Sequence, residues 1–408
     1  MSNYFKNTEL AELYGISEAT VRNWLKASKQ DAHGLELVER NGRVHVAKSI
    51  SNISIVEKLV RENRKYRNAL ASRTIIADQK LFEVFDEARV YDIVRSMELH
   101  GEVPHQYTYF EEGVPLWEES ANEQLSVERP SMLRRTIELI ESNYGYIDSL
   151  TTKYKKVNII DIGVGNAAPV KGLLTKLIQQ NRLGRYIAID FSKGMLDLAR
   201  GHLEEWFGGT IQYEEYVLDM AYDRFANLLS RDYLNPDHDA VNLVLLLGAT
   251  PNNLRVTSDA FRTIYESING DDLFIYTDKL EPPNAPPEWF EHGSKNMKTK
   301  PDIAKWHKIV FDLIGIDEAL YDFEVGFDKR LNQRYARARF KVATTLVFNF
   351  STGSRSLSLE KGDAIVLWRC LQTTQRSLLD LLESAGFYVM HTSQSEDHNY
   401  ILTVAKVH

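Results

Sequence analysis

The sequence predicts an α/β fold built around a doubly wound, mainly parallel sheet. Apolar runs typical of buried strands alternate with helical patterns between residues 151 and 280, and several of these runs end in an acidic residue or a glycine. The first run is followed by a Gly-x-Gly turn and a helix. Strands that alternate with helices favour a parallel sheet, whose ligand binds beyond the carboxyl ends of the strands. We therefore expect a ligand site at these strand ends.

The glycine turn is the most informative stretch of the chain. The apolar run Val157–Ile160 leads into Asp161, Gly163 and Gly165, and a helical pattern begins near Ala167. A strand, a tight turn and a helix leave backbone N–H groups aimed outward, and glycine lets a ligand approach the backbone closely. The turn therefore predicts a cradle for a nucleotide-type cofactor.

Four further apolar runs continue the alternation, and each of them ends near an acid or a glycine. They are Tyr186–Ile189 before Asp190, Ile211–Leu218 before Asp219, Val241–Leu247 before Gly248, and Leu273–Tyr276 close to Asp278. In a parallel sheet these residues meet at one edge.

Length, charge and cysteine content exclude several classes of protein. The 408 residues suffice for two or three domains, and a net charge of −8 argues against an overall polycation for nucleic acid or membranes. The single cysteine, Cys370, excludes an intrachain disulfide, and no Cys/His cluster indicates zinc or another metal. The start of the chain lacks a signal peptide, and no stretch is apolar for long enough to span a bilayer. We expect a cytoplasmic protein.

The first fifty residues predict a small unit of their own. Thr8 and Ser17 are placed to cap two short helices with Gly15 between them, and an alternating segment around Asn41-Gly42 predicts a hairpin. The stretch ELAELYGISEATVRNWLK and the hairpin resemble a winged helix-turn-helix of the excisionase or MerR type. The resemblance implies DNA binding, and a helical hairpin for protein contacts is the alternative. The residues expected at DNA are Arg22, Asn23, Lys26 and Arg43.

A mostly basic helical segment follows, approximately over residues 51–70. It can touch phosphates, form a homodimer through Ile53, Val56, Leu59 and Val60 at helical spacing, or serve as a solvated linker.

These patterns divide the chain into four parts. We expect a winged helix-turn-helix over residues 1–50, a basic linker helix over 51–75, an α+β substrate lobe over 76–150 and 281–372, and the sheet core over 151–280 and 373–408.

The acids at the strand ends indicate which cofactor the turn holds. Dinucleotide folds usually add a third glycine, and Ala168 occupies that place here. The set Asp161, Gly163, Gly165, Asp190 and Asp219 resembles the class I, Rossmann-like methyltransferases that use S-adenosyl-L-methionine. The resemblance implies that Asp190 takes the ribose hydroxyls and that Asp219 lies at the adenine amino group. The other expected cofactor residues are Ser192, Met220 and Gly248.

Longer motifs resemble one methyltransferase family. DIGVGNAAPVKGLL, YIAIDFSKGML, LLLGATPNNL and LFIYTDKL are similar to core motifs of the histidine-specific methyltransferases, which include the enzyme that trimethylates histidine in ergothioneine biosynthesis. YFEEGVPLWEES is similar to that family's aromatic segment, and KGDAIVLWRCLQTT falls where the family binds its substrate. The resemblance covers about residues 100 to 408 and implies an inserted lobe that closes over an amino-acid substrate.

The resemblance implies roles for individual residues. Asn253 matches the asparagine that holds the amino and carboxylate end of the substrate, and Tyr109 matches a tyrosine that faces the nitrogen to be methylated. Tyr109 is thus the expected catalytic residue. Gly248 and Thr250 line the methionine part of the cofactor, and Lys171 lies about two positions after the family's lysine. Core packing is the alternative for Tyr109, and a helix N-cap is the alternative for Asn253.

The chain departs from the family where the imidazole ring would bind. The family places a glutamate and a serine there, and this chain has Trp368 and Cys370. A site built to hydrogen-bond its substrate loses discrimination when those bonds are missing. We therefore expect an acceptor other than histidine, and Trp368 can stack on a flat amine or a guanidinium.

The sequence favours an S-adenosylmethionine-dependent N-methyltransferase acting on a small amine or amino-acid-like molecule, associated with DNA through its first domain. The alternative is a DNA-binding transcriptional regulator whose methyltransferase-like half senses a ligand. A nucleic-acid base methylase is disfavoured, because GATPNNL lacks the second proline and the aromatic residue of the box that grips a flipped base.

Overall fold

The computed structural model describes residues 3–407 apart from 15, 31–32, 41, 72–73, 127–130, 234–238 and 282–300. For residues 61–71, 231–233 and 301–304 it describes the backbone alone. The chain forms two compact units, Met1–Ile75 with Val342–Thr345, and Ile76–Lys341 with Leu346–His408. The turn residues Gly15 and Asn41 lie outside the described part.

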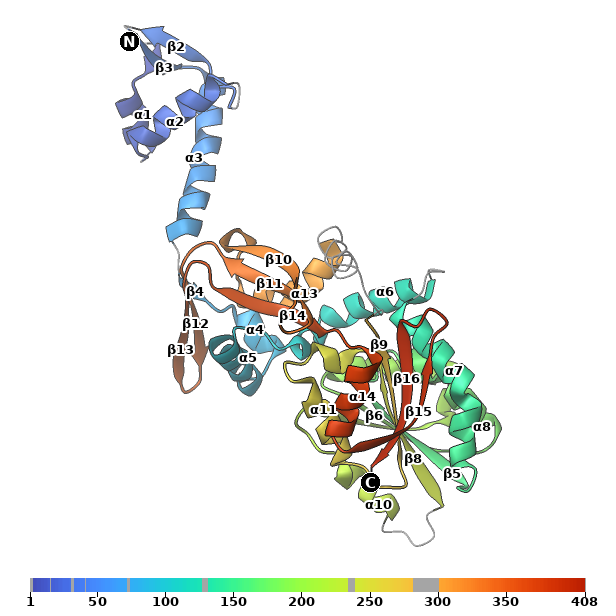
Figure 1. Cartoon of the computed structure of the whole chain (residues 1–408). Coiled ribbons are helices and arrows are strands. Elements are labelled where there is room, and N and C mark those ends of the chain that lie inside the picture. The colour runs from blue at the N-terminus through green and yellow to red at the C-terminus, as the bar shows by residue number, and fades with distance from the viewer. Residues whose placement is uncertain are drawn as a thin grey trace. The chain divides into compact units, whose positions relative to one another are not determined.

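The N-terminal unit contains two short helices and a three-stranded antiparallel sheet of order β1-β3-β2 (Figure 1). Ser17 caps the second helix by accepting a hydrogen bond from the N–H of Thr20, as the sequence predicts, whereas the first helix begins at Asn7 and includes Thr8. The elements are β1 (Tyr4–Phe5), α1 (Asn7–Tyr14), α2 (Glu18–Ser28), β2 (Leu37–Arg40), β3 (Arg43–Ala47), α3 (Ile50–Ala71) and β4 (Thr74–Ile76). Val21, Trp24 and Val46 belong to its buried core.

The larger unit is built on a seven-stranded sheet of order β15-β16-β9-β8-β5-β6-β7. The five strands from β9 to β7 are parallel to their neighbours, and the β15–β16 hairpin adds two antiparallel strands beside β9. The predicted doubly wound sheet is thus correct. The strands are β5 (Lys156–Ile162), β6 (Leu183–Asp190), β7 (Gln212–Val217), β8 (Ala240–Leu247), β9 (Leu273–Lys279), β15 (Phe387–Gln394) and β16 (Tyr400–Val407).

Helices cover both faces of this sheet (Figure 1). One buried cluster joins the sheet to α7 (Met132–Thr151), α8 (Lys171–Gln179) and α9 (Lys193–Phe207), and the other joins it to α10 (Ala226–Tyr233), α11 (Thr257–Tyr265) and α14 (Gln375–Ser384). Strands that are covered on both faces read as continuous apolar runs, which is why the sequence located them. Short 3₁₀ turns lie at η2 (Ala168–Val170), η3 (Gly208–Thr210) and η4 (Thr250–Asn253).

A lobe of helices and antiparallel strands is inserted around this core. Its helical elements are α4 (Gln79–Val84), α5 (Glu87–His100), η1 (His105–Tyr109), α6 (Gly113–Ser126), α13 (Pro301–Ile314) and η5 (Glu318–Leu320). Its strands are β10 (Tyr321–Asp328), β11 (Gln333–Phe340) and β14 (Ala364–Leu371), which form one sheet in that order, and the β12 (Thr344–Phe350) and β13 (Gly353–Leu359) pair.

The strands β4 and β10 are not among the strands that the sequence predicts. In β10 apolar residues alternate with polar ones, and the strand pairs along its whole length with the neighbouring β11. Among the helices that the structure describes, none is both long and apolar enough to cross a membrane.

Candidate functional site

The carboxyl ends of β5, β6, β7 and β8 meet at one edge of the sheet. The strand β5 lies between β6 and β8, and the chain leaves β5 toward one face of the sheet and β8 toward the other. The crevice outside such a reversal of strand order is the usual ligand site of an open α/β sheet.

The glycine turn after β5 leaves room that a side chain would fill. Gly163 has a φ of +67°, and a Cβ there would lie 3.4 Å from Cε of Met220 and 3.9 Å from Oγ1 of Thr250. The turn therefore brings together three residues that the sequence assigned to the cofactor. Gly163 also fixes the turn, because its N–H donates to the carbonyl oxygen of Ile189 over 2.8 Å.

Helix α6 of the inserted lobe packs against the same turn. A Cβ on Gly165 would lie 2.7 Å from Cη2 of Trp117, and a Cβ on Gly194 would lie 2.9 Å from Cγ2 of Val114. Next to Trp117 in α6, Oε1 of Glu118 lies 3.1 Å from Nε2 of His202. Only glycine permits this close packing of the lobe on the turn.

Asp161 is held inside the sheet. Its side chain is 3% exposed, and its Oδ2 accepts a hydrogen bond of 2.6 Å from the hydroxyl of Tyr186. Burial raises the pKa of the Asp161 carboxyl to about 7, against the hydrogen bond from Tyr186, which lowers it. The hydrogen bond thus connects Asp161, at the start of the glycine turn, with Tyr186 of the neighbouring strand β6.

Asp190 and Ser192 lie at the end of β6. The N–H of Ser192 donates to Oδ1 of Asp190 over 2.9 Å, and burial raises the pKa of the Asp190 carboxyl to about 7. Ser192 is fully buried, and its Oγ has no hydrogen-bond partner. A half-buried carboxylate and a buried unpaired hydroxyl leave hydrogen-bonding capacity for a bound group with hydroxyls.

Asp219 lies just beyond β7. Its Oδ1 accepts from the N–H of Ala221 over 2.9 Å, and its Oδ2 accepts from Nε2 of Gln106 over 3.3 Å. Burial raises the pKa of its carboxyl above the ordinary value. Gln106 belongs to η1, so the inserted lobe reaches the edge of the sheet here.

The segment after β8 is fixed by buried polar contacts. The N–H of Gly248, whose φ is +123°, donates to Oγ1 of Thr277 over 2.9 Å. Asn252 is 1% exposed and donates through Nδ2 to both oxygens of Asp278, over 2.9 and 3.1 Å. These contacts hold the short turn η4, which presents Thr250 on one side and Asn253 on the other.

Tyr109 lies in an aromatic cluster of the inserted lobe. Its hydroxyl is 3.3 Å from Nε2 of His105, and its ring packs edge-on against Trp306 with centroids 5.4 Å apart. Burial raises the pKa of the Tyr109 hydroxyl, and the charge of Asp190 adds to the effect. Tyr109 is therefore protonated at neutral pH and close to the acid at the end of β6.

A chain of contacts connects Tyr109 with Asn253. The ring of His105 is 5.6 Å from that of His307, and His307 stacks on Trp368 at 5.5 Å with an interplanar angle of 28°. The indole Nε1 of Trp368 donates to Oδ1 of Asn253 over 3.1 Å. Three of the predicted substrate residues thus belong to one cluster.

The two histidines of this cluster were not anticipated from the sequence. His105 lies four residues before the start of the aromatic segment YFEEGVPLWEES, whereas His307 is an isolated histidine in α13 with no motif around it. Burial lowers the pKa of His105 to about 3, and burial together with His105 lowers the pKa of His307. Both rings are neutral at physiological pH.

Cys370 and Lys171 lie outside the contact chain from Tyr109 to Asn253. Cys370 follows Trp368 by two residues in β14, and its Sγ is 3.5 Å from Nε2 of Gln372. Burial raises the pKa of its thiol to about 12, with Asp278 as the second cause. Lys171 lies over the ring of Trp206, 4.3 Å from its centroid.

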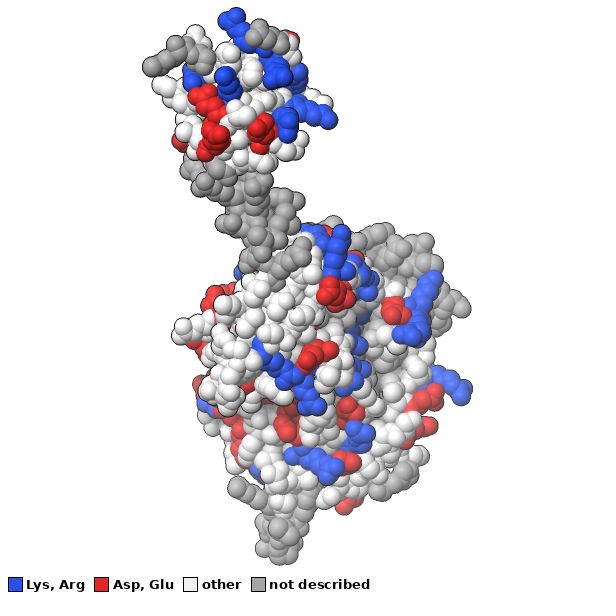
Figure 2. Space-filling model, turned by 90° about the vertical axis from the view of Figure 1, so that its left-hand side faces the viewer, with Lys and Arg blue, Asp and Glu red and all other residues white. Residues whose placement is uncertain are grey.

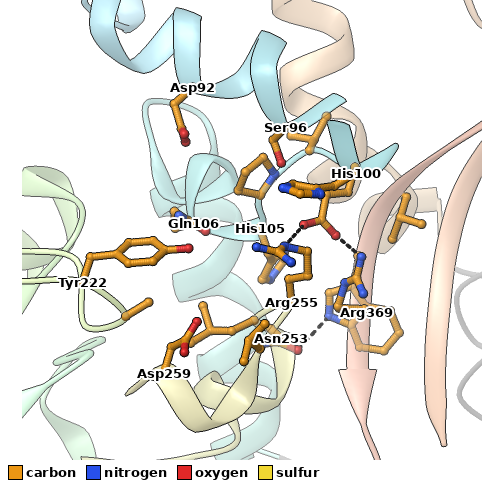
Figure 3. A pocket seen from close by; sticks show the side chains of 18 of the residues that line it. Asp92, Ser96, His100, His105, Gln106, Tyr222, Asn253, Arg255, Asp259 and Arg369 are labelled. Carbon is orange, nitrogen blue, oxygen red and sulfur yellow. Dashed lines mark hydrogen bonds and ion pairs between the residues drawn. The ribbon is translucent and has the colours of Figure 1, made fainter. Parts of the chain in front are cut away.

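A cavity of about 340 Å³ opens between the end of the sheet and the inserted lobe. Gln106, Asn253 and Trp368 line it, so it adjoins both the Asp219 end and the aromatic cluster. Figure 3 shows Asp92, Tyr222 and Asp259 on one side of the cavity and Arg255 and Arg369 on the other. Tyr109 and Cys370 do not line it.

No group of histidine, cysteine, aspartate and glutamate side chains in the described parts of the chain could hold a metal ion. The residues at the strand ends fit S-adenosylmethionine instead. Gly163 leaves space beside Met220, Asp190 offers a half-buried carboxylate, and Ser192, whose N–H is bonded to that carboxylate, has an unpaired Oγ. A ribose with two hydroxyls matches that donor set.

The four residues expected at DNA lie on the surface of the N-terminal unit. Arg22, Asn23 and Lys26 are exposed on α2, while Val21, Trp24 and Leu25 of the same helix are buried. Arg43 is exposed at the start of β3. Figure 2 shows basic side chains gathered on one side of this unit and acidic ones on another.

The sheet, its strand order and the acids at its strand ends define a class I methyltransferase fold. Residues 90–285 match the family model described as histidine-specific methyltransferase, SAM-dependent. The protein is an S-adenosylmethionine-dependent methyltransferase, and S-adenosylmethionine is its cofactor. No curated protein has a sequence that matches this chain.

Several solved methyltransferases resemble the structure distantly. An S-adenosylmethionine-dependent methyltransferase from Clostridium acetobutylicum ATCC 824 is 9% identical, with 71% of this chain and 98% of that one covered and a TM-score of 0.39. The glycopeptide N-methyltransferase MtfA with S-adenosylmethionine is 11% identical, with 67% of this chain and 94% of that one covered and a TM-score of 0.34. CalS10, an amino pentose methyltransferase from Micromonospora echinaspora, is 13% identical, with 71% of this chain and 96% of that one covered and a TM-score of 0.33.

Proposed function

We propose that the protein methylates the nitrogen of a small amine or amino-acid-like molecule other than histidine. The observation that carries the proposal is the contact chain from Tyr109 through His105, His307 and Trp368 to Asn253. The chain connects Asn253, the predicted substrate asparagine, with Tyr109, whose pKa is raised by burial and by the charge of Asp190. The acceptor would bind along this chain, with its amine at Tyr109.

The proposed roles follow from the chemistry of the groups. S-adenosylmethionine supplies an electrophilic methyl group on a sulfonium, whose thioether leaves without an acid. Asp190, Ser192 and Asp219 would hold its adenosine part, with Gly163, Gly165 and Met220 beside them and Gly248 and Thr250 along its methionine part. Tyr109 would accept a hydrogen bond from the amine N–H, which leaves the nitrogen lone pair free to face the methyl group. Asp161 would not contact the cofactor, because its carboxyl is bonded to the hydroxyl of Tyr186 inside the sheet.

Histidine is disfavoured because Trp368 and Cys370 offer an imidazole no charged acceptor. The indole of Trp368 is a donor only, and it is already bonded to Asn253. The Cys370 thiol remains protonated, with its pKa raised to about 12. An imidazole N–H in this region would therefore lose the acceptor that it needs.

The test is to measure release of S-adenosylhomocysteine by the full-length chain with a panel of amines and amino acids, and to locate the added mass by mass spectrometry. We expect transfer to nitrogen, with histidine slower than the best acceptor. Asp190→Ala should lose cofactor binding in calorimetry, and Asp197→Ala, on the exposed side of α9, should retain it. Transfer to oxygen or sulfur only, or full cofactor binding by Asp190→Ala, would contradict the proposal.

We also propose that residues 1–50 form a winged helix-turn-helix that binds duplex DNA, followed by a linker over 51–75. Residues 76–150 and 281–372 would form the substrate lobe, apart from α7, which packs on the sheet, and 151–280 with 373–408 would form the core. The exposed Arg22, Asn23 and Lys26 on the outer face of α2 favour this second function. The protein would then be a DNA-associated enzyme or a regulator whose larger unit senses a ligand.

This second proposal predicts binding that weakens with salt, because phosphate contacts release counterions. A gel shift of the full chain with duplex DNA from its own genomic neighbourhood should show a complex at low salt. The triple variant of Arg22, Lys26 and Arg43 to alanine should lose it, and Arg376→Ala on α14 should not. Sedimentation of the same samples tests a homodimer. No complex at low salt would exclude the DNA-binding function.

A further inference from the structure

The cavity beside the aromatic cluster contains an arginine whose guanidinium end is unpaired. Nε of Arg255 lies 3.4 Å from Oε1 of Glu102. In the part of the chain that the structure describes, the two terminal nitrogens of Arg255 make no hydrogen bond or ion pair. Its side chain is 42% exposed and lines the cavity, as does Tyr222.

Glu102 holds two arginines in place. Its side chain is 7% exposed, its Oε2 binds Nη2 of Arg369, and its Oε1 faces Arg255 (Figure 3). One carboxylate thus balances two guanidinium groups, and Arg369 is itself only 15% exposed. Arg369 is also bonded to Gln333 over 3.4 Å, so of the two arginines at Glu102, Arg255 is the one with unpaired terminal nitrogens.

The acids of the cavity do not neutralise Arg255. Asp92 accepts a hydrogen bond from the hydroxyl of Tyr107 over 2.8 Å, and Asp259 is paired with Arg262 over 2.7 Å. Figure 3 shows both acids across the cavity from Arg255. The Arg255 side of the cavity therefore has a net positive charge, and the planar fork of a guanidinium matches the oxygens of a carboxylate or a phosphate.

The cavity also borders the site of methyl transfer. His105 and Trp368 line it, and these residues connect Tyr109 with Asn253. We propose that the methyl acceptor carries an anionic group, a carboxylate or a phosphate, away from the amine that is methylated, and that Arg255 binds this group. Glu102 and Arg369 are positioning residues that orient Arg255. The inference rests on the proposed function, because it places the amine at Tyr109.

The experiment compares acceptors that differ only in the distal group. Glutamate with glutamine tests a carboxylate, and O-phosphoserine with serine and O-phosphotyrosine with tyrosine test a phosphate. Binding of each molecule to the full-length chain loaded with S-adenosylhomocysteine is measured by calorimetry, which needs no turnover. We expect the anionic member of at least one pair to bind about 10- to 100-fold more tightly, the effect of one or two charge-assisted hydrogen bonds.

Arg255→Gln should abolish the difference within that pair and leave the affinity for S-adenosylhomocysteine unchanged. Arg376→Gln, a surface arginine on α14 that is 91% exposed, is the matched control and should keep the difference. Equal affinities within every pair, an unchanged difference in Arg255→Gln, or no binding by any of the six molecules would overturn the inference. A loss of S-adenosylhomocysteine affinity in Arg255→Gln would also overturn it, since Arg255 would then serve the cofactor.

Failure of the proposed function has a different outcome. If the chain transfers methyl groups to no nitrogen but the anionic members still bind through Arg255, the proposed reaction is wrong and the anionic site stands. If amines are methylated without regard to a distal charge, the reaction stands and the anionic site is wrong.

Discussion

The indole Nε1 of Trp368 donates a hydrogen bond of 3.1 Å to Oδ1 of Asn253. The bond turns the amide so that its Nδ2 donor is left for another acceptor, and it connects strand β14 of the inserted lobe with η4 at the edge of the sheet. Trp368 of the inserted lobe therefore orients Asn253, the proposed substrate asparagine, at the edge of the sheet.

We predict that Trp368→Phe raises the KM for the acceptor about fivefold, because it keeps the ring that stacks on His307 and removes one hydrogen bond of about 1 kcal/mol. The affinity for S-adenosylhomocysteine should not change. Steady-state kinetics with the best acceptor measures the first effect, and calorimetry measures the second.

A double-mutant cycle separates orientation from packing. In an Asn253→Ala background, Trp368→Phe should have little further effect, because the amide that it orients is gone. If the two substitutions are additive in that cycle, the bond does not serve the acceptor.

The raised pKa of Asp190 leads us to expect that the affinity for the cofactor depends on pH. Its carboxyl has a pKa raised to about 7 by burial, so it is mostly neutral at pH 6 and mostly ionised at pH 8. The ionised form is the stronger acceptor for hydroxyl groups. The affinity for S-adenosylhomocysteine should therefore fall up to about tenfold from pH 8 to pH 6, if binding needs the charged form.

Two variants test the assignment of this titration. Asp190→Asn should bind weakly with a flat pH profile, whereas Asp161→Asn, at the acid bonded to Tyr186, should keep the slope. Calorimetry at pH 6, 7 and 8 gives all three profiles. A slope that survives in Asp190→Asn would assign it to another group.

Gly163→Ala should weaken cofactor binding strongly. The residue would need a positive φ of +67°, which costs about 1–2 kcal/mol, and its Cβ would lie 3.4 Å from Cε of Met220 in the space left for the cofactor. Gly362→Ala is the matched control, because its φ is +97° and its Cβ would meet nothing within 4 Å. Both variants should lose thermal stability, and cofactor binding should be lost in Gly163→Ala alone.

Sequence patterns located the central strands β5, β6, β8 and β9 because most of their residues are buried. The apolar runs ending at Asp161, Asp190 and Asp219 became β5, β6 and β7, with Asp219 two residues after the end of β7, and the glycine turn adopts positive φ angles at Gly163 and Gly165. These features are local, since each depends on a few consecutive residues.

The substrate side of the site depends on contacts between distant residues. His307, Glu102 and Arg255 belong to α13, the segment after α5 and the segment after η4, and no motif marks any of them. Cys370 follows Trp368 by two residues, yet Trp368 reaches Asn253 and the cavity, while Cys370 lies near Asp278. Only the packing of β14 against the sheet core separates their surroundings.

Asp278 supports η4 from inside the protein. It is fully buried and accepts hydrogen bonds from Nδ2 of Asn252 at 2.9 Å and Oγ1 of Thr373 at 2.8 Å. Asp278→Ala would leave both donors without an acceptor and should lower the free energy of unfolding by about 2–4 kcal/mol. Chemical denaturation measures the loss, and Asp271→Ala, an exposed acid at the other end of β9, should cause almost none.

The pH dependence of the free energy of unfolding is a second test of Asp278. Burial raises the pKa of the Asp278 carboxyl to about 6, above the ordinary value of 3.8. A carboxyl with a raised pKa stabilises the folded state at low pH, and this contribution is lost as the pH rises from 3.8 through 6. Asp278→Asn should therefore flatten the stability profile between pH 4 and 6. A profile as steep as that of the parent chain would contradict the buried charge.

Tyr109→Phe tests whether the hydroxyl takes part in methyl transfer. The hydroxyl lies 3.3 Å from Nε2 of His105, and the phenylalanine would keep the edge-on contact with Trp306. We expect kcat to fall about 10- to 100-fold, because an amine without a hydrogen-bond acceptor is poorly aligned with the methyl group. The affinity for S-adenosylhomocysteine and the thermal stability should stay near those of the parent chain.

The matched control for Tyr109→Phe is Tyr107→Phe, two residues earlier in the same 3₁₀ turn. The hydroxyl of Tyr107 donates to Asp92 over 2.8 Å and does not contact His105, so its loss should lower stability slightly and spare kcat. Stopped-flow single turnovers distinguish a slower chemical step from slower product release. If Tyr109→Phe and Tyr107→Phe reduce the single-turnover rate equally, the aromatic segment serves packing, and the amine is aligned by other groups.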